Sequence, residues 1–374
     1  MNDNEFYRGA RVAVTGAAGT IGRALVDKLL ALGVDEVRAL DNNEGELFLC
    51  AEMRRKDPRF RPFVVDVRDG ESLTRLFRGM QYAFHSAALK HVQMCETSPF
   101  SAVATNVNGV ENVIRAGLSG AVKRVLFASS DKAVNPTNVM GSSKLLGERL
   151  FSAAMALGRL DGGTIFASTR FGNVAGSRGS VFPVFTQQIA RGGPLTLTDR
   201  RMTRFVMTLD QATAMLLKCL TRANGGEVFI TKMPALRVAD LAEVMVEKLA
   251  PFFGHDPGRI EIVEVGTQPG EKLYEELASH EEIRRTTDNG GLLVVTPPFV
   301  APLPEQPVSG VRNSAEETPM TKDEIAQFLT APDVLPDNLR DHLLKGAHSG
   351  HVPGGSSIRK QADDRPSRRR ANSN

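Results

Sequence analysis

The chain has 374 residues, of which 41% are hydrophobic and 24% are charged, so it can bury the core of one large domain plus a smaller lobe. No run approaches about 18 apolar residues and no apolar stretch precedes the first expected strand, so we expect a cytoplasmic protein with neither a membrane span nor a signal peptide. The formal net charge is +3, but residues 347–374 alone carry +4, so the basic character belongs to the tail and a nucleic-acid partner is not expected.

In chain order, short β-rich runs alternate with longer segments of helical periodicity. The expected strands are RVAVTG (11–16), EVRALD (36–41), FVVDV (63–67), YAFHSAA (82–88), RVLFASS (124–130) and IFASTRFGN (165–173). Helical spacing is present between them, at 20–33, 71–79, 101–117 and 144–158. Apolar strands separated by helices predict an α/β fold, a Rossmann-like doubly wound parallel sheet whose ligands bind at the carboxyl ends of the strands.

Beyond residue 173 the alternation loosens. Helical segments at 181–193, 209–221 and 237–250 are interspersed with short strands at 227–231 and 259–265, which suits a smaller substrate lobe. We therefore predict a dinucleotide-binding domain over 8–173 and a mainly substrate-binding lobe over 174–300. A linker with short helices is expected over 301–346, and a disordered basic tail over 347–374.

A glycine-rich turn predicts the cofactor site. The segment VAVTGAAGTIGRAL places Gly16, Gly19 and Gly22 between a strand and a helix, where bare backbone lets a pyrophosphate approach the free N–H groups of the helix. Asp41 follows Gly22 by nineteen residues at the end of the second strand, where a carboxylate can bind ribose hydroxyls and repels a 2′-phosphate. The pattern favours NAD, and the polar and basic residues after Asp41 keep NADP open.

Further cofactor contacts are expected where the next strands end. Asp66 can accept from the adenine amine, and the small side chains of Ala87 and Ala88 let the cofactor lie against bare backbone. The full set expected around the cofactor is Gly16, Ala18, Gly19, Thr20, Ile21, Gly22, Asp41, Asn42, Asp66, Val67, Ala87, Ala88, Lys90, Asn106 and Lys144.

The stretch SSDKAVNPTNVMGSSK (129–144) follows the fifth strand, where the reacting part of the cofactor is expected. Short-chain dehydrogenases place a tyrosine four residues before a helical lysine, so that both lie on one helix face. Here Lys144 keeps the lysine position, Met140 replaces the tyrosine, and the chain contains no Y-x-x-x-K. The adjacent Asp131 and Lys132 could share the proton transfers, because a lysine can remove an acidic C–H proton while a carboxylic acid protonates a departing hydroxyl.

Six blocks of sequence carry a family resemblance: SSDKAVNPTNVMGSSKLLGE, HSAALKHV, TRFGNVAGSRGSVFPVF, LTLTDRRMTRFVMT, GGEVFITKMPALRVADLAE and QPGEKLYEEL. Together they resemble the nucleotide-sugar 4,6-dehydratases of bacterial polysaccharide and glycan biosynthesis, which are extended short-chain dehydrogenases acting on UDP-N-acetylglucosamine. The resemblance covers roughly residues 8–330. It implies a UDP-sugar substrate, a homo-oligomer, and a tightly bound nicotinamide cofactor that is regenerated in every cycle.

The resemblance also implies roles for the residues after the fifth strand. In this family the C4 hydride is removed, water leaves across C5–C6, and the hydride returns to C6. Lys132 matches the residue that abstracts the C5 proton, and Asp131 the acid that assists loss of the C6 hydroxyl. Ser130 would hydrogen-bond the C4 oxygen, and Lys144 would hold the nicotinamide ribose.

Met140 departs from the tyrosine pattern, although a methionine there also occurs among polysaccharide-associated relatives, so it does not imply an inactive protein. A thioether cannot take a proton near neutral pH. The base for oxidation at C4 therefore stays open among Lys132, which we favour by a small margin, Lys144, and a water relayed through Ser130.

Substrate contacts are implied for five residues: Lys90, Asn173, Arg178, Arg204 and Glu271. Asn173 would bind the sugar phosphate, the two arginines offer forked guanidinium groups suited to the diphosphate, and Glu271 would bind the uridine ribose. Gln268 stands where many relatives have arginine, so this region carries one positive charge fewer.

The favoured prediction is a UDP-N-acetylglucosamine 4,6-dehydratase, a lyase that uses NAD and no metal. A UDP-sugar 4-epimerase shares the oxidation at C4, but it needs neither a C5 base nor an acid for a leaving hydroxyl, so Asp131 and Lys132 argue against it. A non-catalytic NAD-sensing protein is suggested by the missing tyrosine alone. The configuration at C5 stays open, with the PTNVMG block favouring retention, as do the oligomeric state, the glycan served and the role of the tail.

Overall fold

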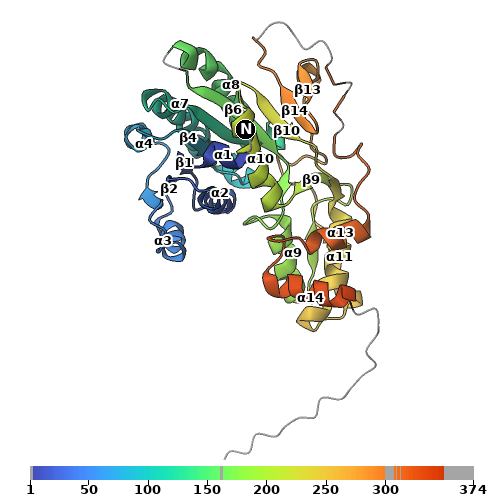
Figure 1. Ribbon diagram of the computed structural model, residues 1–374. Coiled ribbons are helices and arrows are strands. Elements are labelled where there is room, and N and C mark those ends of the chain that lie inside the picture. Colours follow the sequence, from blue (N-terminus) through green and yellow to red (C-terminus); the bar gives the residue numbers. More distant parts are fainter. Residues whose placement is uncertain (1–2, 161–162, 300–306, 309, 312, 349–374) are drawn as a thin grey trace, which may run out of the picture.

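A nine-stranded sheet forms the centre of the protein in the computed structural model, which describes residues 3–160, 163–299, 307–308, 310–311 and 313–348 (Figure 1). The strand order is β13-β14-β10-β6-β5-β4-β1-β2-β3. The seven strands from β10 to β3 run parallel, while β14 and β13 are antiparallel to their neighbours. The strands are β1 (Arg11–Thr15), β2 (Glu36–Asp41), β3 (Phe60–Val64), β4 (Tyr82–His85), β5 (Arg124–Ser130), β6 (Ile165–Phe171), β10 (Val228–Thr231), β13 (Thr286–Asp288) and β14 (Leu292–Val295).

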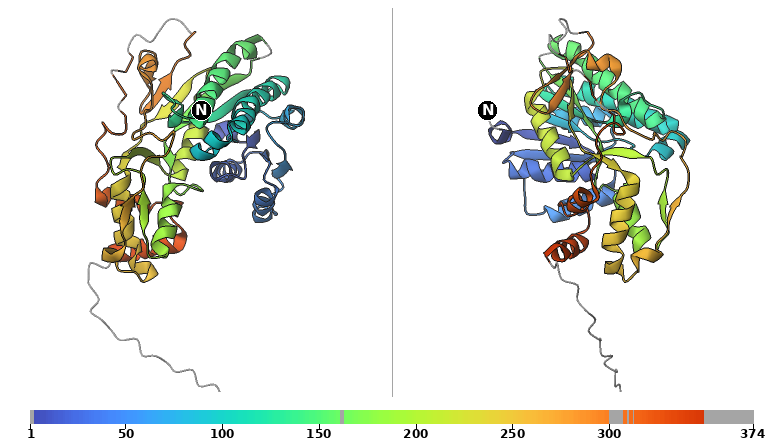
Figure 2. Two further views of the ribbon diagram at one scale, coloured as in Figure 1. Left: turned by 180° about the vertical axis from the view of Figure 1, so that it is seen from behind. Right: turned by 90° about the vertical axis from the view of Figure 1, so that its right-hand side faces the viewer.

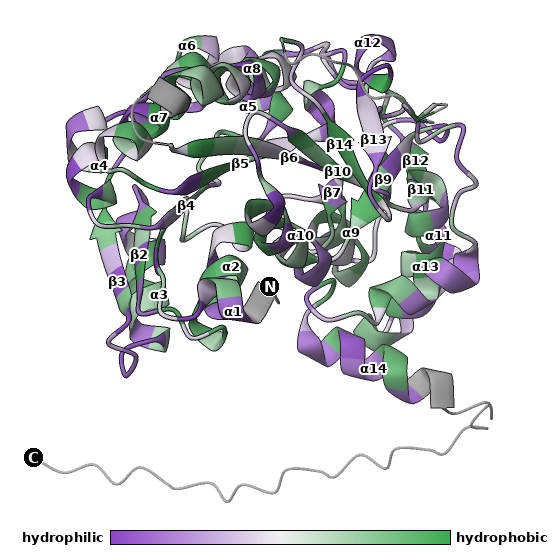
Figure 3. Cartoon of the chain, turned by 45° about the horizontal axis from the view of Figure 1, so that its top comes forward, coloured by the Kyte–Doolittle hydropathy of each residue, from purple (hydrophilic) through white to green (hydrophobic). Residues whose placement is uncertain are grey.

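Helices cover both faces of this sheet, as Figure 3 shows. One face is covered by α1 (Asp3–Tyr7), α2 (Thr20–Ala31) and α10 (Leu209–Arg222), and the other by α4 (Gly70–Phe77), α7 (Gly109–Ser119) and α8 (Val139–Leu160). The central strands are almost wholly buried, as in β5, where the residues from Val125 to Ser129 are all buried, whereas the edge strand β3 is largely exposed. This architecture confirms the predicted doubly wound α/β fold.

A second lobe packs below one end of the sheet (Figures 1 and 2). Its strands are β7 (Asn173–Val174), β8 (Leu195–Leu197), β9 (Thr203–Met207), β11 (Ala235–Arg237) and β12 (Ile262–Glu264). Its helices are α9 (Val181–Ala190), α11 (Val238–Leu249), α13 (Lys322–Leu329) and α14 (Asp337–His348). Buried side chains of this lobe, among them Phe182, Leu241 and Ile325, form a core separate from that of the sheet.

The expected division at residue 173 does not coincide with the layers of the structure. Strands β10, β13 and β14 and helix α10 come from beyond that residue, yet they extend or cover the large sheet. The 174–300 segment therefore contributes to both lobes, and the four-part division stays a prediction. Most of the predicted tail, from residue 349, lies outside the described residues.

Two features of the structure bear on the cellular setting: the character of its helices and the state of its cysteines. Within the described ranges, no helix combines the length and the apolar character that a bilayer crossing needs. The cysteines at 50, 95 and 219 are buried as free thiols. The cytoplasmic location stays a prediction.

Candidate active site

The glycine turn lies between β1 and α2 and forms a cradle of bare backbone. Gly16 has φ +69, and a Cβ there would lie 2.7 Å from the backbone nitrogen of Ala87, while a Cβ at Gly22 would collide with the carbonyl oxygen of Gly16. Helix α2 begins after Gly19, and no side chain caps its first N–H groups. Both features fit the pyrophosphate of a dinucleotide, because they leave N–H groups and the positive end of a helix accessible to an anion.

Asp41 ties the end of β2 to this turn. Its carboxylate accepts hydrogen bonds from the backbone N–H groups of Ala18, at 2.9 Å, and of Asn43, at 2.9 Å. A carboxylate has further acceptor positions, so these bonds leave it able to accept from a ribose hydroxyl.

Asp66 lies in the loop after β3, because that strand ends at Val64 rather than at the predicted residue 67. It pairs with Arg68 at 2.6 Å and accepts from Asn42 Nδ2 at 3.1 Å. The hydrogen bonds from Arg68 lower the pKa of Asp66 to about 2. Arg68 thus occupies part of the hydrogen-bond acceptor capacity of Asp66, which the sequence predicted to accept from the adenine amine.

Asn106 contacts the protein itself. It is buried in the short π-helix η1 (Ala104–Asn108), accepts from Leu89 N–H at 2.8 Å, and donates to Leu89 O and to Ser143 Oγ, both at 2.9 Å. These bonds join the loop after β4 to helix α8. Asn106 therefore shapes the cofactor site by holding the Ala87–Lys90 loop, and Val67, which is buried against Gly109, likewise packs within the protein.

Arg178 reaches the glycine turn from the second lobe. Its Nη2 donates to Ala18 O at 2.7 Å, its Nη1 lies 2.9 Å from Glu46, and its own carbonyl accepts from Lys90 Nζ at 2.7 Å. Its backbone N–H donates to Thr20 Oγ1 at 3.4 Å. Arg178 and Lys90, both expected at the substrate, thus connect the second lobe to the rim of the cofactor cradle.

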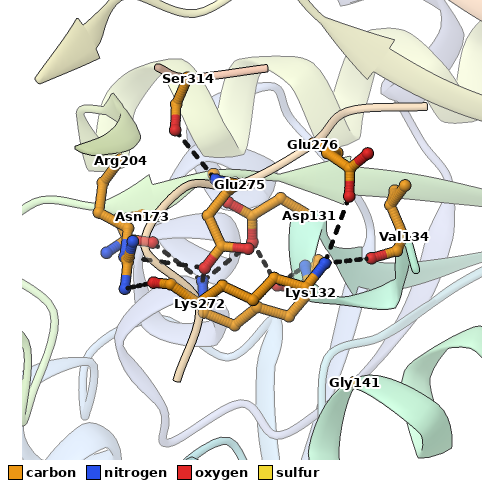
Figure 4. Close-up of polar contacts among 12 residues, drawn as sticks. Asp131, Lys132, Val134, Gly141, Asn173, Arg204, Lys272, Glu275, Glu276 and Ser314 are labelled. Atoms are coloured by element: carbon orange, nitrogen blue, oxygen red, sulfur yellow. Dashed lines mark hydrogen bonds and ion pairs between the residues drawn. The ribbon is translucent and has the colours of Figure 1, made fainter. Parts of the chain in front are cut away.

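Lys132 lies at the centre of a polar cluster that joins both lobes (Figure 4). Its Nζ donates to Asp131 Oδ1 at 3.0 Å and to Asn173 Oδ1 at 3.1 Å, and it forms an ion pair with Glu275 Oε1 at 3.3 Å. Asp131 and Glu275 are buried, whereas the Lys132 side chain keeps 21% of its surface exposed. The structure therefore brings together three predicted residues, Asp131, Lys132 and Asn173, and adds a fourth that was not predicted.

The charges in this cluster control one another. Burial by itself lowers the pKa of Lys132, but the carboxylates of Asp131 and Glu275 outweigh it and hold that pKa above its usual value. Burial, together with the charge of Asp131, raises the pKa of Glu275, although Lys132 opposes this. In the absence of substrate, Lys132 is thus an ammonium group and not a free base.

The start of this segment has a fixed backbone. Ser130 Oγ donates to Asp131 Oδ1 at 2.9 Å and accepts from Lys132 N–H at 3.3 Å, at the beginning of the 3-10 turn Asp131–Ala133. A Cβ at Gly141 would collide with the carbonyl oxygen of Lys132, so a glycine is needed where α8 packs against this turn. The Ser130 hydroxyl and the Lys132 amine therefore donate to the same oxygen of Asp131.

Met140 and Lys144 occupy different surroundings on helix α8. Met140 is 3% exposed and packs with Cys95 and Ala102, which is a purely apolar contact. Lys144 Nζ donates to Ala128 O at 2.8 Å and lies 4.7 Å from the centre of the Phe127 ring. Burial lowers the pKa of Lys144 to about 8. Burial therefore lowers the pKa of Lys144 while two carboxylates raise that of Lys132, and the identity of the C4 base stays a prediction.

Of the remaining predicted substrate residues, Arg204 borders the Lys132 cluster, whereas Glu271 contacts its own loop. Arg204 is buried and donates to the carbonyls of Thr203, at 2.7 Å, and of Lys272, at 2.9 Å, while its Nε lies 3.7 Å from Glu275. Its guanidinium is thus largely used within the protein. The Glu271 carboxylate accepts from the Gln268 N–H at 3.3 Å and closes its own loop. Their roles at a nucleotide stay predictions.

Sequence reasoning missed Glu275 and Ser314. Glu275 belongs to the QPGEKLYEEL block, in which only Glu271 was given a role, and Ser314 lies in the segment predicted to be a linker. Ser314 Oγ accepts from the Glu275 N–H at 2.9 Å, and the Ser314 N–H donates to Glu275 O at 2.9 Å. The adjacent Glu275 and Glu276 of that block were the only local signal, and the sequence does not distinguish the buried Glu275 from the half-buried Glu276.

Comparison with known proteins places the chain among enzymes of sugar nucleotides. The family model described as polysaccharide biosynthesis protein matches residues 12–297. The chain is 46% identical over 295 residues to the uncharacterized membrane protein MJ1061 of Methanocaldococcus jannaschii, covering 79% of this chain and 88% of that protein. It is 38% identical over 282 residues to a UDP-glucose 4-epimerase of Rickettsia rickettsii, covering 74% and 79%.

Solved structures of similar proteins support the same placement. The X-ray structure of Pen from Bacillus thuringiensis is similar with a TM-score of 0.84 at 37% identity, covering 88% of this chain and 100% of that one. DesIV, a dTDP-glucose 4,6-dehydratase from Streptomyces venezuelae with NAD and TYD bound, gives 0.62 at 25% identity, covering 70% and 86%. The expectation of a nicotinamide cofactor agrees with this neighbour. From the family match, the relatives and the fold, the chain belongs to the polysaccharide biosynthesis protein family of nucleotide-sugar epimerases and dehydratases, built on the extended short-chain dehydrogenase fold.

Proposed function

We propose that the protein is a UDP-N-acetylglucosamine 4,6-dehydratase, which forms a UDP-4-keto-6-deoxy-N-acetylhexosamine for glycan or polysaccharide biosynthesis. The observation that carries this proposal is the pairing of Lys132 Nζ with the buried Asp131 carboxylate at 3.0 Å, directly after β5. Elimination of water next to a ketone needs a base for the C5 proton and an acid for the C6 hydroxyl. These two residues supply both.

The cofactor is NAD, held by the cradle of Gly16, Gly19 and Gly22, by the N-terminus of α2 and by Asp41. When bound, it supplies reversible hydride transfer. The residues of the protein orient it: Asn106 and Arg178 fix the loops on either side of the cradle. The positive end of α2 offsets the charge of the pyrophosphate.

The chain's own residues then move protons. Ser130 is placed to hydrogen-bond the C4 oxygen, and Lys144, with its pKa lowered to about 8, is the better candidate to receive the C4 hydroxyl proton. The Asp131 carboxylate would first gain a proton and then donate it to the departing C6 hydroxyl through Oδ2, which has no hydrogen-bond partner among the described residues. Over the cycle this proton is balanced by the one that the C4 hydroxyl releases. Lys132 would take the C5 proton and return a proton to the same carbon, which accords with retention at C5.

A UDP-sugar 4-epimerase is the second candidate, supported by the 38% identity to a UDP-glucose 4-epimerase over most of the chain. Such an enzyme would use the same cradle and the same C4 chemistry. The buried Asp131 and Glu275 around Lys132 support the dehydratase, because returning a hydride to C4 requires neither group.

One assay separates the two. Purified protein is incubated with UDP-N-acetylglucosamine in deuterated water, and the product is followed by NMR. We expect a 4-keto sugar with a new 6-methyl group and deuterium at C5. A C4 epimer without deuterium would identify the epimerase and reject the dehydratase.

Lys132→Ala is expected to lower turnover by about 100-fold or more, because the general base is removed. The cofactor content after purification should stay at the wild-type level, since Lys132 lies outside the cradle. Turnover and cofactor content are both measured on the purified variant. Full activity in this variant would remove Lys132 from the mechanism.

A further inference from the structure

Glu275 is fixed from behind by a second layer of hydrogen bonds. Its backbone N–H donates to Ser314 Oγ at 2.9 Å, and its carbonyl accepts from the Ser314 N–H at 2.9 Å. The same Ser314 hydroxyl lies 2.8 Å from Thr203 Oγ1 on β9. Ser314 and Glu275 are 0% and 2% exposed, so the carboxylate is held in a buried position that its own loop would not maintain (Figure 4).

The Glu275 carboxylate points toward Lys132, with Oε1 lying 3.3 Å from Nζ. The three oxygens around Lys132 Nζ come from three parts of the chain: Asp131 from the turn after β5, Asn173 from β7 and Glu275 from the loop before α12 (His280–Ile283). An ammonium group has three N–H donors, so this set fully engages it. A lysine bound in this way cannot take a proton from substrate until one of its own protons has moved.

Glu275 has room to take that proton. Its Oε2 is buried and has no hydrogen-bond partner in the part of the chain that the structure describes. The nearby Arg204 does not occupy it, because the Arg204 Nη groups donate to backbone carbonyls and its Nε lies 3.7 Å from the other oxygen, Oε1.

We propose that Glu275 is a positioning residue that receives a proton from the Lys132 ammonium when substrate binds and so converts Lys132 into the base for C5. This inference rests on the proposed dehydratase function. It identifies the group that activates the lysine, which neither the motif nor the family resemblance assigns.

The step is balanced in protons and involves no electron transfer. An N–H bond of the Lys132 ammonium breaks and an O–H bond forms on Glu275, which leaves a neutral amine and a carboxylic acid. The amine then takes the C5 proton and later returns a proton to C5. Finally, Glu275 gives its proton back to Lys132, which restores the ion pair for the next cycle.

Substrate binding provides the driving force. The Lys132 side chain is 21% exposed, and a sugar bound over it would shield the cluster from water. Loss of water disfavours an ion pair relative to the neutral pair. The charged groups that face Lys132 are Asp131, Glu275 and Arg204, and those that face Glu275 are Lys132, Asp131 and Arg204. Burial already raises the pKa of Glu275, which makes it a better proton acceptor than an exposed carboxylate.

The decisive variant is Glu275→Gln, which keeps the shape of the side chain and an oxygen for Lys132 but cannot accept the proton. We expect kcat with UDP-N-acetylglucosamine to fall about 100-fold, with little change in KM, and deuterium uptake at C5 to fall in parallel. Glu275→Asp should recover part of kcat, and Glu276→Gln is the matched control. Glu276 is adjacent in sequence but pairs with Lys272, at 3.5 Å, instead of Lys132.

A purely electrostatic role for Glu275 predicts the opposite result. Without this carboxylate the Lys132 ammonium is less stable, so more of the neutral amine would be present and kcat near neutral pH would rise. An unchanged or higher kcat in Glu275→Gln, with cofactor content and Tm at wild-type levels, would therefore overturn the inference.

A measurement without substrate separates this inference from the proposed function. Lysines are labelled with ¹³C at Cε, Lys132→Arg identifies the Lys132 signal, and its pH titration is followed by NMR. In Glu275→Gln we expect the Lys132 midpoint to fall by about one pH unit or more. An unchanged midpoint would reject the coupling whatever the substrate proves to be. A purely electrostatic role also predicts a lowered midpoint, so this result establishes the coupling, and the fall in kcat of Glu275→Gln decides the proton transfer. A lowered midpoint in a protein that does not act on UDP-N-acetylglucosamine would keep the coupling and reject only the proposed substrate.

Discussion

The two lysines of the site lose their protons at different pH, and their surroundings explain why. Lys132 faces two carboxylates, which hold its pKa above the usual value. Lys144 of helix α8 is buried with a carbonyl and the Phe127 ring as its near contacts, and this burial lowers its pKa to about 8. A neutral amine is therefore available at position 144 under conditions where Lys132 is still charged.

This difference predicts how the first oxidation depends on pH. A group with a lowered pKa is protonated below that pKa and neutral above it, so the Lys144 amine can accept a proton increasingly well as the pH rises through about 8. We expect the rate at which reduced nicotinamide appears, followed by stopped-flow absorbance, to rise with pH over this range. Lys144→Gln should lower the rate by about 100-fold and remove the rise.

The matched control is Lys248→Gln on α11, where the lysine pairs with Glu247 at the surface of the second lobe. It should retain the wild-type profile. If Lys144→Gln kept the same rise near pH 8, the C4 proton would have to go to another group, and Lys132 and a water relayed through Ser130 would be the remaining candidates.

At the scale of elements, a buried arginine joins three segments behind the site. Arg170 on β6 is 0% exposed and forms paired hydrogen bonds with Glu148 of α8, at 2.7 and 2.9 Å, and with Glu282 of α12, also at 2.7 and 2.9 Å. Burial alone would raise the pKa of Glu282, but the hydrogen bonds from Arg170 outweigh it and lower this pKa to about 2. The helix that carries Lys144 is thereby fixed to the strand that leads to Asn173.

Arg170→Met is expected to lower the free energy of unfolding by about 3–5 kcal/mol, because it removes the nearest cation from two buried carboxylates and leaves Glu282 with only the more distant Arg149, at 3.6 Å, and Arg285, at 3.8 Å. Chemical denaturation measures the loss. Arg75→Met on α4 is the control, since Arg75 pairs with Glu71 on an exposed helix face and such a pair contributes only about 0.3–0.5 kcal/mol. Equal losses in the two variants would contradict the importance of the buried triad.

The glycine turn and the ends of β2 and β5 could be predicted from sequence because their signals are local, whereas β3, β4 and β6 end two or three residues earlier than predicted. The spacing from Gly16 to Asp41 lies within one βαβ unit, and residues 124–130 form β5 as predicted. Glu275 and Ser314 could not be found in this way. They reach Lys132 through contacts that span more than a hundred residues and involve loops without periodicity. For the same reason Arg204 could be recognised as an arginine near the site, but not as one that binds backbone carbonyls.

At the scale of the whole molecule, several large apolar side chains are exposed on three helices that pack together. Helices α5 (Val92–Thr97) and α6 (Pro99–Val103) pack against α8 on one side of the sheet (Figure 3). The exposed side chains on these helices include Phe100, at 90%, Met94, at 59%, and Leu146, at 46%. Large apolar side chains in such an arrangement are typical of surfaces that bind another protein. A second copy of the chain is the expected partner, because the family resemblance implies a homo-oligomer.

Phe100→Glu should therefore weaken self-association, because a twofold interface would bring the new charge into an apolar contact from both subunits at once. We expect the mass measured by light scattering at micromolar concentration to fall from that of an oligomer to that of the 40.5 kDa chain. Val265→Glu is the control, since Val265 is 55% exposed but follows β12 in the second lobe. A wild-type protein that is already monomeric, or a Phe100→Glu variant that keeps the wild-type mass, would show that this surface does not join two copies, and the apolar helices would then need a different partner.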